Sequence, residues 1–229
     1  MSISTDVTDS LLFNVVLCIN LKRRPDRKEQ IINECRRVKL ASILSFVEAI
    51  DGSLLDDHLI SSKLINVPHK GIKLWKTQYA CALSHIKAME EFVSLNVSAA
   101  LILEDDALFS SDFVSRYNEV NTTASLINKS NYWSILTLGH LFDVRTVENT
   151  HSTSLSTLDW FCGAHAYIIK RIAAIRFINK YKDNIWAPFD DMLAYACNKE
   201  FKTLHCIPSI VFQREGFSDV DNADAPKRV

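Results

Sequence analysis

Three consecutive carboxylates, Glu104-Asp105-Asp106, follow the apolar run Ala99-Ala-Leu-Ile-Leu103. A continuous apolar run is typical of a strand buried on both faces, as in a parallel sheet. Three acids at the end of such a strand repel one another unless a positive charge lies between them. A divalent cation, held by oxygen ligands and shared with substrate phosphates, would supply that charge. The spacing alone suits both a metal site and a solvated acidic turn.

A basic cluster follows an earlier apolar segment. Lys22-Arg23-Arg24 comes directly after residues 11–21, and Pro25-Asp26 has the pattern of a helix start. The cluster is therefore predicted at a strand-to-helix turn, at the carboxyl end of a strand, where ligands bind in open α/β sheets. An anion contact and a solvated basic turn both fit this position.

Two further groups consist of residue types that serve in catalysis or metal binding in other proteins. Asp190-Asp191 follows Pro188-Phe189 at a predicted helix start, where one acid can serve as a general base or both can cap the helix. His85 follows Ser84 in an amphipathic segment, where it is either a ligand or a core residue.

Strands and helices must alternate to position these residues. The apolar patterns predict strands at 11–21, 44–50, 99–104, 132–138, 161–169, 203–207 and 209–212. They predict helices that begin at 25, 76, 111, 172 and 188. This order predicts an α/β fold with three α/β/α layers and a mostly parallel central sheet. We expect one domain over 1–229, with disorder at 1–10, a loop at 142–157 and a polar tail at 221–229.

The composition excludes several classes of protein. The chain has 229 residues, is 48% hydrophobic and carries a formal net charge of -1, so no global field favours nucleic acid. Six cysteines without a C-x-x-C pair indicate reduced core residues rather than disulfides or a zinc site. The apolar segment 11–21 is too short for a membrane span. We expect a cytoplasmic protein with at most peripheral membrane association.

Seven segments resemble, in order, the motifs of glycosyltransferase family 25, which includes lipooligosaccharide and procollagen galactosyltransferases. The first, Ile19-Asn-Leu-Lys-Arg-Arg-Pro-Asp-Arg27, resembles its I-N-L-x-x-R-x-D-R signature. The other six are Ala49-Ile-Asp-Gly52, Cys81-Ala-Leu-Ser-His85, Leu101-Ile-Leu-Glu-Asp-Asp-Ala107, Gly163-Ala-His-Ala-Tyr167, Pro188-Phe-Asp190, and Gln213 with Ser218-Asp-Val220. Two positions depart from the family pattern, Ala80 in place of a usual Gly and Gln78 in place of a common acid.

The resemblance implies a GT-A type fold, a nucleotide-sugar donor that is usually a UDP-sugar, and Mn²⁺ or Mg²⁺. We expect Asp106 as the first metal ligand and Glu104 as the second, because alternation along an extended chain puts both on the same side. Asp105 is then expected to face the sugar or ribose hydroxyls.

The matched motifs also assign the remaining site residues. Arg23 and Arg27 are expected at the donor, Asp51 at its base or ribose, and His85 at the diphosphate or metal. Asp190 is expected as the general base of an inverting transfer, with Asp191 as the alternative. His165 and Tyr167 are expected on the acceptor side. The other donor-side residues are Asn20, Leu21, Ala49, Ser84, Gln213, Ser218 and Asp219.

These expectations combine into a metal-dependent inverting transfer of a sugar from a UDP-sugar to a hydroxyl of a glycan, glycolipid or glycoprotein. Galactose is the favoured sugar, and glucose and xylose stay open. One alternative is a degenerate transferase domain that binds a sugar nucleotide or a partner without turnover. A second is a metal-dependent phosphohydrolase, since acids after an apolar strand also suit phosphate chemistry.

Overall fold

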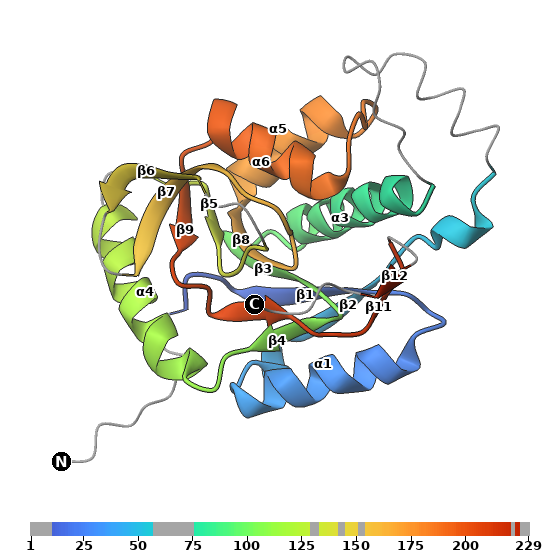
Figure 1. The fold of residues 1–229 in the computed structure, drawn as a ribbon, viewed down its shortest axis with the longest axis horizontal. Coiled ribbons are helices and arrows are strands. Elements are labelled where there is room, and N and C mark those ends of the chain that lie inside the picture. The colour runs from blue at the N-terminus through green and yellow to red at the C-terminus, as the bar shows by residue number, and fades with distance from the viewer. Residues whose placement is uncertain are drawn as a thin grey trace.

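A central sheet of eight strands organises the computed structural model of the chain, which describes residues 11–56, 76–128, 133–141, 145–150, 154–220 and 223–224. The strand order is β2-β1-β3-β8-β5-β9-β7-β6 (Figure 1). In chain order these strands are β1 (Val15–Asn20), β2 (Leu44–Glu48), β3 (Ala99–Glu104), β5 (Ile135–Thr137), β6 (Arg145–Thr150), β7 (Leu155–Trp160), β8 (Ala166–Lys170) and β9 (Thr203–Cys206).

The sheet is mixed but largely parallel. Strand β1 pairs in parallel with β2 and β3, and β5 pairs in parallel with β9. Strand β8 runs antiparallel to β3 and β5, and β7 runs antiparallel to β9 and β6. Six strands therefore run one way and β7 and β8 the other, which confirms the predicted α/β fold.

Helices cover both faces of this sheet. One face packs against α3 (Lys76–Ser94), α5 (Arg171–Tyr181) and α6 (Phe189–Lys199), and the other against α1 (Pro25–Arg37) and α4 (Phe113–Asn128) (Figure 1). Along β1, Leu17 and Ile19 join the first core while Val16 and Cys18 join the second. A strand buried on both faces needs apolar residues at every position, which explains the continuous apolar runs of β1 and β3.

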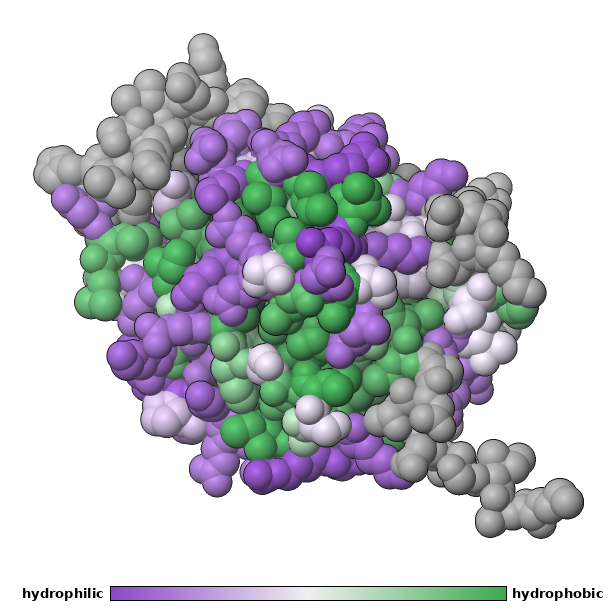
Figure 2. Space-filling view, turned by 180° about the vertical axis from the view of Figure 1, so that it is seen from behind, coloured by the Kyte–Doolittle hydropathy of each residue, from purple (hydrophilic) through white to green (hydrophobic). Residues whose placement is uncertain are grey.

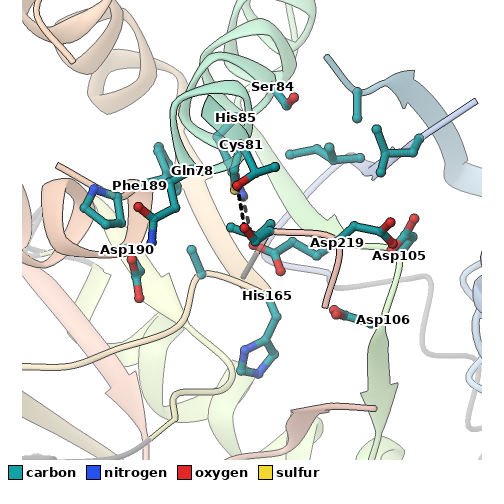
Figure 3. Close-up of a pocket in the computed structure, with 18 of the residues that line it drawn as sticks. Gln78, Cys81, Ser84, His85, Asp105, Asp106, His165, Phe189, Asp190 and Asp219 are labelled. Carbon is teal, nitrogen blue, oxygen red and sulfur yellow. Dashed lines mark hydrogen bonds and ion pairs between the residues drawn. The ribbon is translucent and has the colours of Figure 1, made fainter. Parts of the chain in front are cut away.

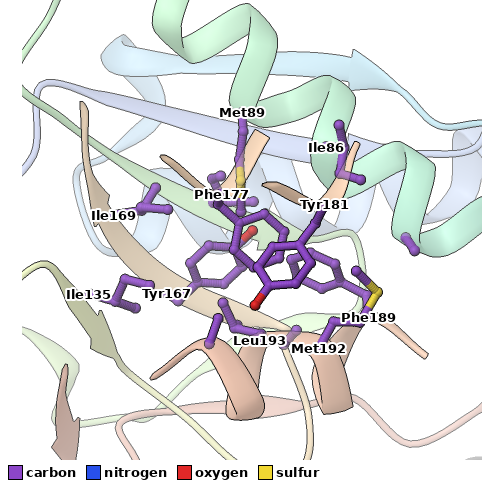
Figure 4. Close-up of a cluster of buried hydrophobic side chains, with 14 of the residues drawn as sticks. Ile86, Met89, Ile135, Tyr167, Ile169, Phe177, Tyr181, Phe189, Met192 and Leu193 are labelled. Carbon is purple, nitrogen blue, oxygen red and sulfur yellow. The ribbon is translucent and has the colours of Figure 1, made fainter. Parts of the chain in front are cut away.

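Aromatic packing fixes the start of α6 against the sheet. The Phe189 ring lies 5.7 Å from that of Phe177 on α5 and 6.2 Å from that of Tyr167 on β8. Met192 and Leu193 of α6 are fully buried in the same cluster (Figure 4). Buried aromatic side chains contribute large apolar areas to a core, so this cluster holds the first turn of α6, and hence Asp190, in one place.

Two small antiparallel sheets bring the end of the chain back to the main sheet. Strand β4 (Ala107–Phe109) pairs with β10 (Val211–Gln213), and Gln213 lies opposite Ala107. Strand β11 (Phe217–Ser218) pairs with β12 (Ala223–Asp224), and β12 lies inside the region 221–229 expected to be a polar tail. The pairing of β4 with β10 places Gln213 beside the acids that follow β3.

Two expectations from the sequence are wrong. The expected loop at 142–157 contains β6 and the start of β7, which pair as an antiparallel ribbon, while 142–144 and 151–153 lie outside the described residues. The strand expected from 161 begins only at Ala166, because Gly163 takes a φ of 88° that turns the chain. The expected disorder at 1–10 also lies outside the described residues, as do residues 225–229 of the expected tail.

The surface opposite to the view of Figure 1 gathers apolar side chains near its centre, within a border of hydrophilic ones (Figure 2). None of the helices in the described ranges is both long and apolar enough to cross a membrane.

Candidate active site

A pocket of about 450 Å³ lies at the carboxyl ends of β1, β2 and β3. In open α/β sheets this edge is the usual place for a ligand. Fifteen of the residues predicted for the site line it, which are Leu21, Arg23, Arg27, Ala49, Asp51, Ser84, His85, Glu104, Asp105, Asp106, His165, Asp190, Asp191, Gln213 and Asp219. The ordered motifs therefore converge on one cavity although they span most of the chain.

All three acids after β3 face the pocket, although β3 ends at Glu104 and residues 105–106 form a turn. The alternation expected for an extended chain thus does not continue to Asp106. Asp105 accepts hydrogen bonds from Asn20 Nδ2 at 2.7 Å and from Arg27 Nη1 at 3.0 Å. Burial raises the pKa of Asp105, and Arg27 and the Asn20 hydrogen bond act in the opposite direction.

Asp106 is the acid with the most strongly altered titration. Burial, and then the neighbouring Glu104 and Asp105 carboxylates, raise its pKa to about 7, against smaller opposing effects of Gln213 and Arg27. Gln213 Nε2 donates to its Oδ2 at 3.0 Å. Its Oδ1 is buried and accepts no hydrogen bond within the described part of the chain. A buried carboxylate oxygen without a partner is costly, so Asp106 has room for a cationic ligand.

Glu104 ends a buried chain of polar side chains. Its Oε1 lies 3.1 Å from His85 Nε2, and His85 Nδ1 lies 3.1 Å from the Tyr167 hydroxyl. Burial lowers the pKa of His85 to about 3, so the imidazole is neutral. The Phe189 ring stacks on it at 3.9 Å and an interplanar angle of 4°. These contacts fix the orientation of the ring.

Cys81 completes a mixed cluster with His85 and Glu104. Their ligand atoms all lie within 4.8 Å of one another, and no other such group of three His, Cys, Asp or Glu side chains occurs in the described ranges. Cys81 and His85 sit four positions apart on α3, and Figure 3 shows both pointing into the pocket. We had expected every cysteine to be a core residue, but Cys81 is only partly buried. The spacing of four on a predicted helix was the signal for this cluster.

An arginine–carboxylate network lines the pocket beside the acids that follow β3. Arg23 Nε lies 2.7 Å from Asp51 Oδ2, and its Nη1 lies 2.7 Å from Asp219 Oδ1. Arg24 also pairs with Asp219, and Arg27 Nη2 lies 3.9 Å from the same carboxylate. Three guanidinium groups thus converge on one anionic group, at the strand-to-helix turn where an anion contact and a solvated basic turn both fitted the sequence.

Asp190 lies across the pocket from Asp105 and Asp219, two carboxylates that pair with these arginines (Figure 3). Its Oδ2 accepts from the Gly163 backbone amide and its Oδ1 from that of Asp191, both at 3.1 Å. Burial, and then the charge of Asp190, raise the pKa of Asp191 to about 6. Neither acid forms a salt bridge with a Lys or Arg of the described residues. Gly163 was not predicted, because a backbone amide leaves no signal in side-chain chemistry.

Three predicted residues do not line the pocket. Asn20 lies beneath it and holds Asp105. Tyr167, expected on the acceptor side, is fully buried behind His85, because β8 points it into the core. Ser218 belongs to β11, and its side chain lies outside the described part of the structure.

Two pocket residues, Ser84 and His165, contact backbone groups of the protein itself. Ser84 Oγ donates to the Ala80 carbonyl at 2.7 Å and accepts from the Ile50 amide at 2.8 Å, which ties residues 49–51 to α3. His165 Nε2 lies 3.2 Å from the Val211 carbonyl oxygen.

Comparison with known protein families identifies the family of the chain. The model of "Glycosyltransferase family 25 (LPS biosynthesis protein)" matches residues 13–193. The chain belongs to glycosyltransferase family 25. The match spans β1, all three acids and Asp190, so the residues of the pocket fall mostly within the family 25 domain.

Curated relatives within family 25 include both transferases and proteins named inactive. "Procollagen galactosyltransferase 1" of Danio rerio is 25% identical over 210 residues, covering 87% of this chain and 34% of its own length. "Inactive glycosyltransferase 25 family member 3" of Homo sapiens is 29% identical over 133 residues, covering 56% of this chain and 22% of its own length. The chain thus matches only about a fifth to a third of these relatives.

A solved structure, mannose-1-phosphate geranyltransferase from Thermus thermophilus, covers 88% of this chain and 76% of its own at 8% identity and a TM-score of 0.45. A likeness at this level carries no argument about function.

Proposed function

We propose that the protein is a metal-dependent inverting glycosyltransferase that moves a sugar, with galactose favoured, from a UDP-sugar to a hydroxyl group of a glycan or glycoconjugate. One observation carries the proposal. In a family 25 chain, the acids after β3 and the arginines after β1 line one pocket, and Asp190 lies across it from Asp105 and Asp106.

The arginines are proposed to hold the diphosphate of the donor. Guanidinium groups match phosphate oxygens as bidentate donors, and Arg23 and Arg27 both line the pocket. When the bond to the sugar breaks, the leaving diphosphate gains negative charge. A unit charge pair at about 4 Å contributes roughly 4 kcal/mol at an effective dielectric constant near 20, so two arginines are worth several kcal/mol in the transition state.

Asp106 and Glu104 are proposed as the protein ligands of Mn²⁺ or Mg²⁺. The donor set fits a hard cation, because it consists of carboxylate oxygens. The Oδ1 of Asp106 is buried and accepts no hydrogen bond in the described ranges, and a cation would stabilise its charged form. When bound, the cation would offset the charge that develops on the leaving diphosphate.

Asp190 is proposed as the general base that takes the proton of the acceptor hydroxyl. The amides of Gly163 and Asp191 fix its carboxylate toward the pocket, and no described cation competes for it. Asp191 is the alternative base, favoured by its pKa of about 6, which lies nearer to neutral pH than that of an ordinary aspartate.

The acceptor is proposed to be a glycan, glycolipid or glycoprotein. The name of the family model, which refers to LPS biosynthesis, and the procollagen galactosyltransferases among the relatives support this class and support galactose as the sugar. A cytoplasmic location and the 1–229 single-domain organisation stay predictions.

Release of UDP tests the proposal. The protein is incubated with UDP-galactose, UDP-glucose or UDP-xylose in Mn²⁺ or in EDTA, and free UDP is measured. We expect Mn²⁺-dependent release that Asp106→Asn and Asp190→Asn abolish. Donor binding without release from any of the three, with or without added glycan acceptors, would favour a domain without turnover, as in the inactive relatives. Cleavage of p-nitrophenyl phosphate without UDP release would favour a phosphohydrolase.

A further inference from the structure

We propose that Cys81, His85 and Glu104 form a binding site for a thiophilic divalent cation of the zinc class. This site shares Glu104 with the one proposed at Asp106, but it adds sulfur and nitrogen ligands, whereas the Asp106 site offers only oxygen ligands. It depends on the identity and placement of three side chains and not on the activity of the protein.

The first argument is the convergence of three different ligand types. One ligand atom each from Cys81, His85 and Glu104 lies within 4.8 Å of the other two. A thiolate, an imidazole and a carboxylate form a donor set that selects zinc-like cations over Mg²⁺ and Mn²⁺, since the soft sulfur ligand favours the former. The cluster therefore fits a cation that carboxylates alone do not select.

The second argument is the rigidity of the ligands. Cys81 and His85 are four residues apart on α3, so the helix presents both on one face, as in other helical zinc motifs. Glu104 comes from the end of β3, whose position is fixed by pairing with β1. The cation would thus bind between two elements that the core already holds in place.

The third argument is the hydrogen-bond partner of His85 Nδ1, the ring nitrogen that would not bind the cation. In metal sites a ligating histidine donates its other N–H to a fixed acceptor, which orients the ring. His85 Nδ1 lies 3.1 Å from the Tyr167 hydroxyl, while Nε2 faces Glu104. Phe189 stacks on the same ring. The tautomer with hydrogen on Nδ1 leaves Nε2 available to a cation.

The site also opens onto the pocket. Cys81, His85 and Glu104 all line the pocket, and the Glu104 side chain is 24% exposed. Three protein ligands with a fourth position toward a cavity are the arrangement of zinc sites that take water or substrate. Binding would release the Cys81 thiol proton to solvent.

Cobalt absorption tests the site directly. Co²⁺ is titrated into the metal-free protein, which is kept reduced with a phosphine. We expect a thiolate-to-cobalt charge-transfer band that saturates at one equivalent and is bleached by Zn²⁺. Cys81→Ser should lose the band, and Cys162→Ser is the matched control, because Cys162 is another partly buried cysteine of the pocket. No band in the wild type, or an unchanged band in Cys81→Ser, would overturn the proposal.

A second measurement uses only the wild type, in case a variant fails to fold. Alkylation of each cysteine is followed by peptide mass spectrometry with and without Zn²⁺. Zn²⁺ should slow alkylation of Cys81 at least about tenfold and leave Cys162 unchanged. Equal rates at Cys81 with and without saturating Zn²⁺ would contradict the site.

A third measurement separates ligation from packing. Tyr167→Phe removes only the hydroxyl near His85, and loss of such a partner weakens metal affinity by about 10–100-fold. The Kd for Zn²⁺ is measured by competition with a chromogenic chelator. An unchanged Kd in Tyr167→Phe would contradict the role given to His85 as a ligand.

Discussion

The two sides of the pocket differ in how their carboxylates are held. On the side of β1 and β3, Asp51, Asp105 and Asp219 are each paired with an arginine. On the side of α6, Asp190 accepts hydrogen bonds from two backbone amides and forms no salt bridge within the described residues, and Asp191 has a raised pKa. The first side is suited to bind an anion in a fixed place, and the second to accept a proton.

This difference follows from the elements that form each side. The arginines come from the turn between β1 and α1, and they meet the end of β3 because the two strands are neighbours in the sheet. Asp190 comes from the first turn of α6, which the aromatic cluster around Phe189 fixes on the other side (Figure 4). Substitutions on the α6 side should therefore lower turnover, and substitutions on the arginine side should lower the affinity for the donor.

The largest effect is expected from removal of the proposed base. Asp190→Asn keeps the shape of the side chain and an oxygen that accepts from one of the two amides, but it cannot take a proton, so turnover should fall by about 10²–10⁴-fold with little change in donor Kd. Steady-state transfer and donor calorimetry give the two values. Asp191→Asn is the matched control and should lose less than about tenfold. The reverse order would assign the base to Asp191.

Asp106→Asn should have the next largest effect. It removes a charge from the proposed hard-cation site and keeps the shape of the side chain, so Mn²⁺-dependent transfer should fall by about 10²–10³-fold. The variant should remain folded, because the buried carboxylate is costly in the absence of a cation. Activity near that of the wild type at saturating Mn²⁺ would remove Asp106 from the metal site.

A smaller effect is expected from one arginine. Arg23 and Arg24 both pair with Asp219, but only Arg23 lines the pocket. Arg23→Gln should weaken donor binding by roughly tenfold, because a charged hydrogen bond contributes about 1.5 kcal/mol. Arg24→Gln serves as the control and should have little effect on donor Kd. Equal losses in the two variants would indicate that the arginines act only through the position of Asp219.

The smallest effect is a pH dependence of stability. The folded-state pKa of Asp191, about 6, lies above its ordinary value of 3.8, so the folded protein binds the proton more tightly than the unfolded chain. The contribution of this group to the free energy of unfolding therefore falls as pH rises from about 4 to about 6.

Thermal unfolding of Asp191→Asn measures this contribution. Solvent screening reduces it to roughly 1 kcal/mol, because the side chain is partly exposed. The Tm of the variant minus that of the wild type should thus be about 2–4 °C larger at pH 7 than at pH 4. Asp183→Asn, in an exposed loop, is the control. A gain that does not change with pH would contradict the raised pKa.

The sequence predicted most of the arginine side, and on the α6 side it predicted the helix start and both acids but not the contacts that hold Asp190. Pro25, the apolar run before Glu104 and the basic turn are local signals, and parallel pairing of β1 with β3 brings them together. The contact of Asp190 with the Gly163 amide joins segments that are 27 residues apart, and it depends on a turn with positive φ. No pattern in the sequence reports such a backbone contact.

The missed ribbon of β6 and β7 has a related cause. The pairing of these strands shifts register between Arg145 and Thr146 and again before Thr150. Leu155 is buried in the core on one face of the sheet and Leu158 in the core on the other, so β7 lacks the period-two hydrophobic pattern of a half-buried strand. Strand β7 is instead specified by its pairing with β9, a contact that only the folded chain provides.

Donor binding measured with and without metal tests the central claim most directly. The thermal unfolding of the wild type and of Asp106→Asn is followed with UDP-galactose, UDP-glucose and UDP-xylose, in Mn²⁺ and in EDTA. Since a ligand that binds only the folded state raises Tm, at least one UDP-sugar should stabilise the wild type in Mn²⁺, and this gain should vanish in EDTA and in the variant. An equal rise in Tm in EDTA, or no rise with any UDP-sugar, would contradict a metal-dependent nucleotide-sugar site at Glu104-Asp105-Asp106.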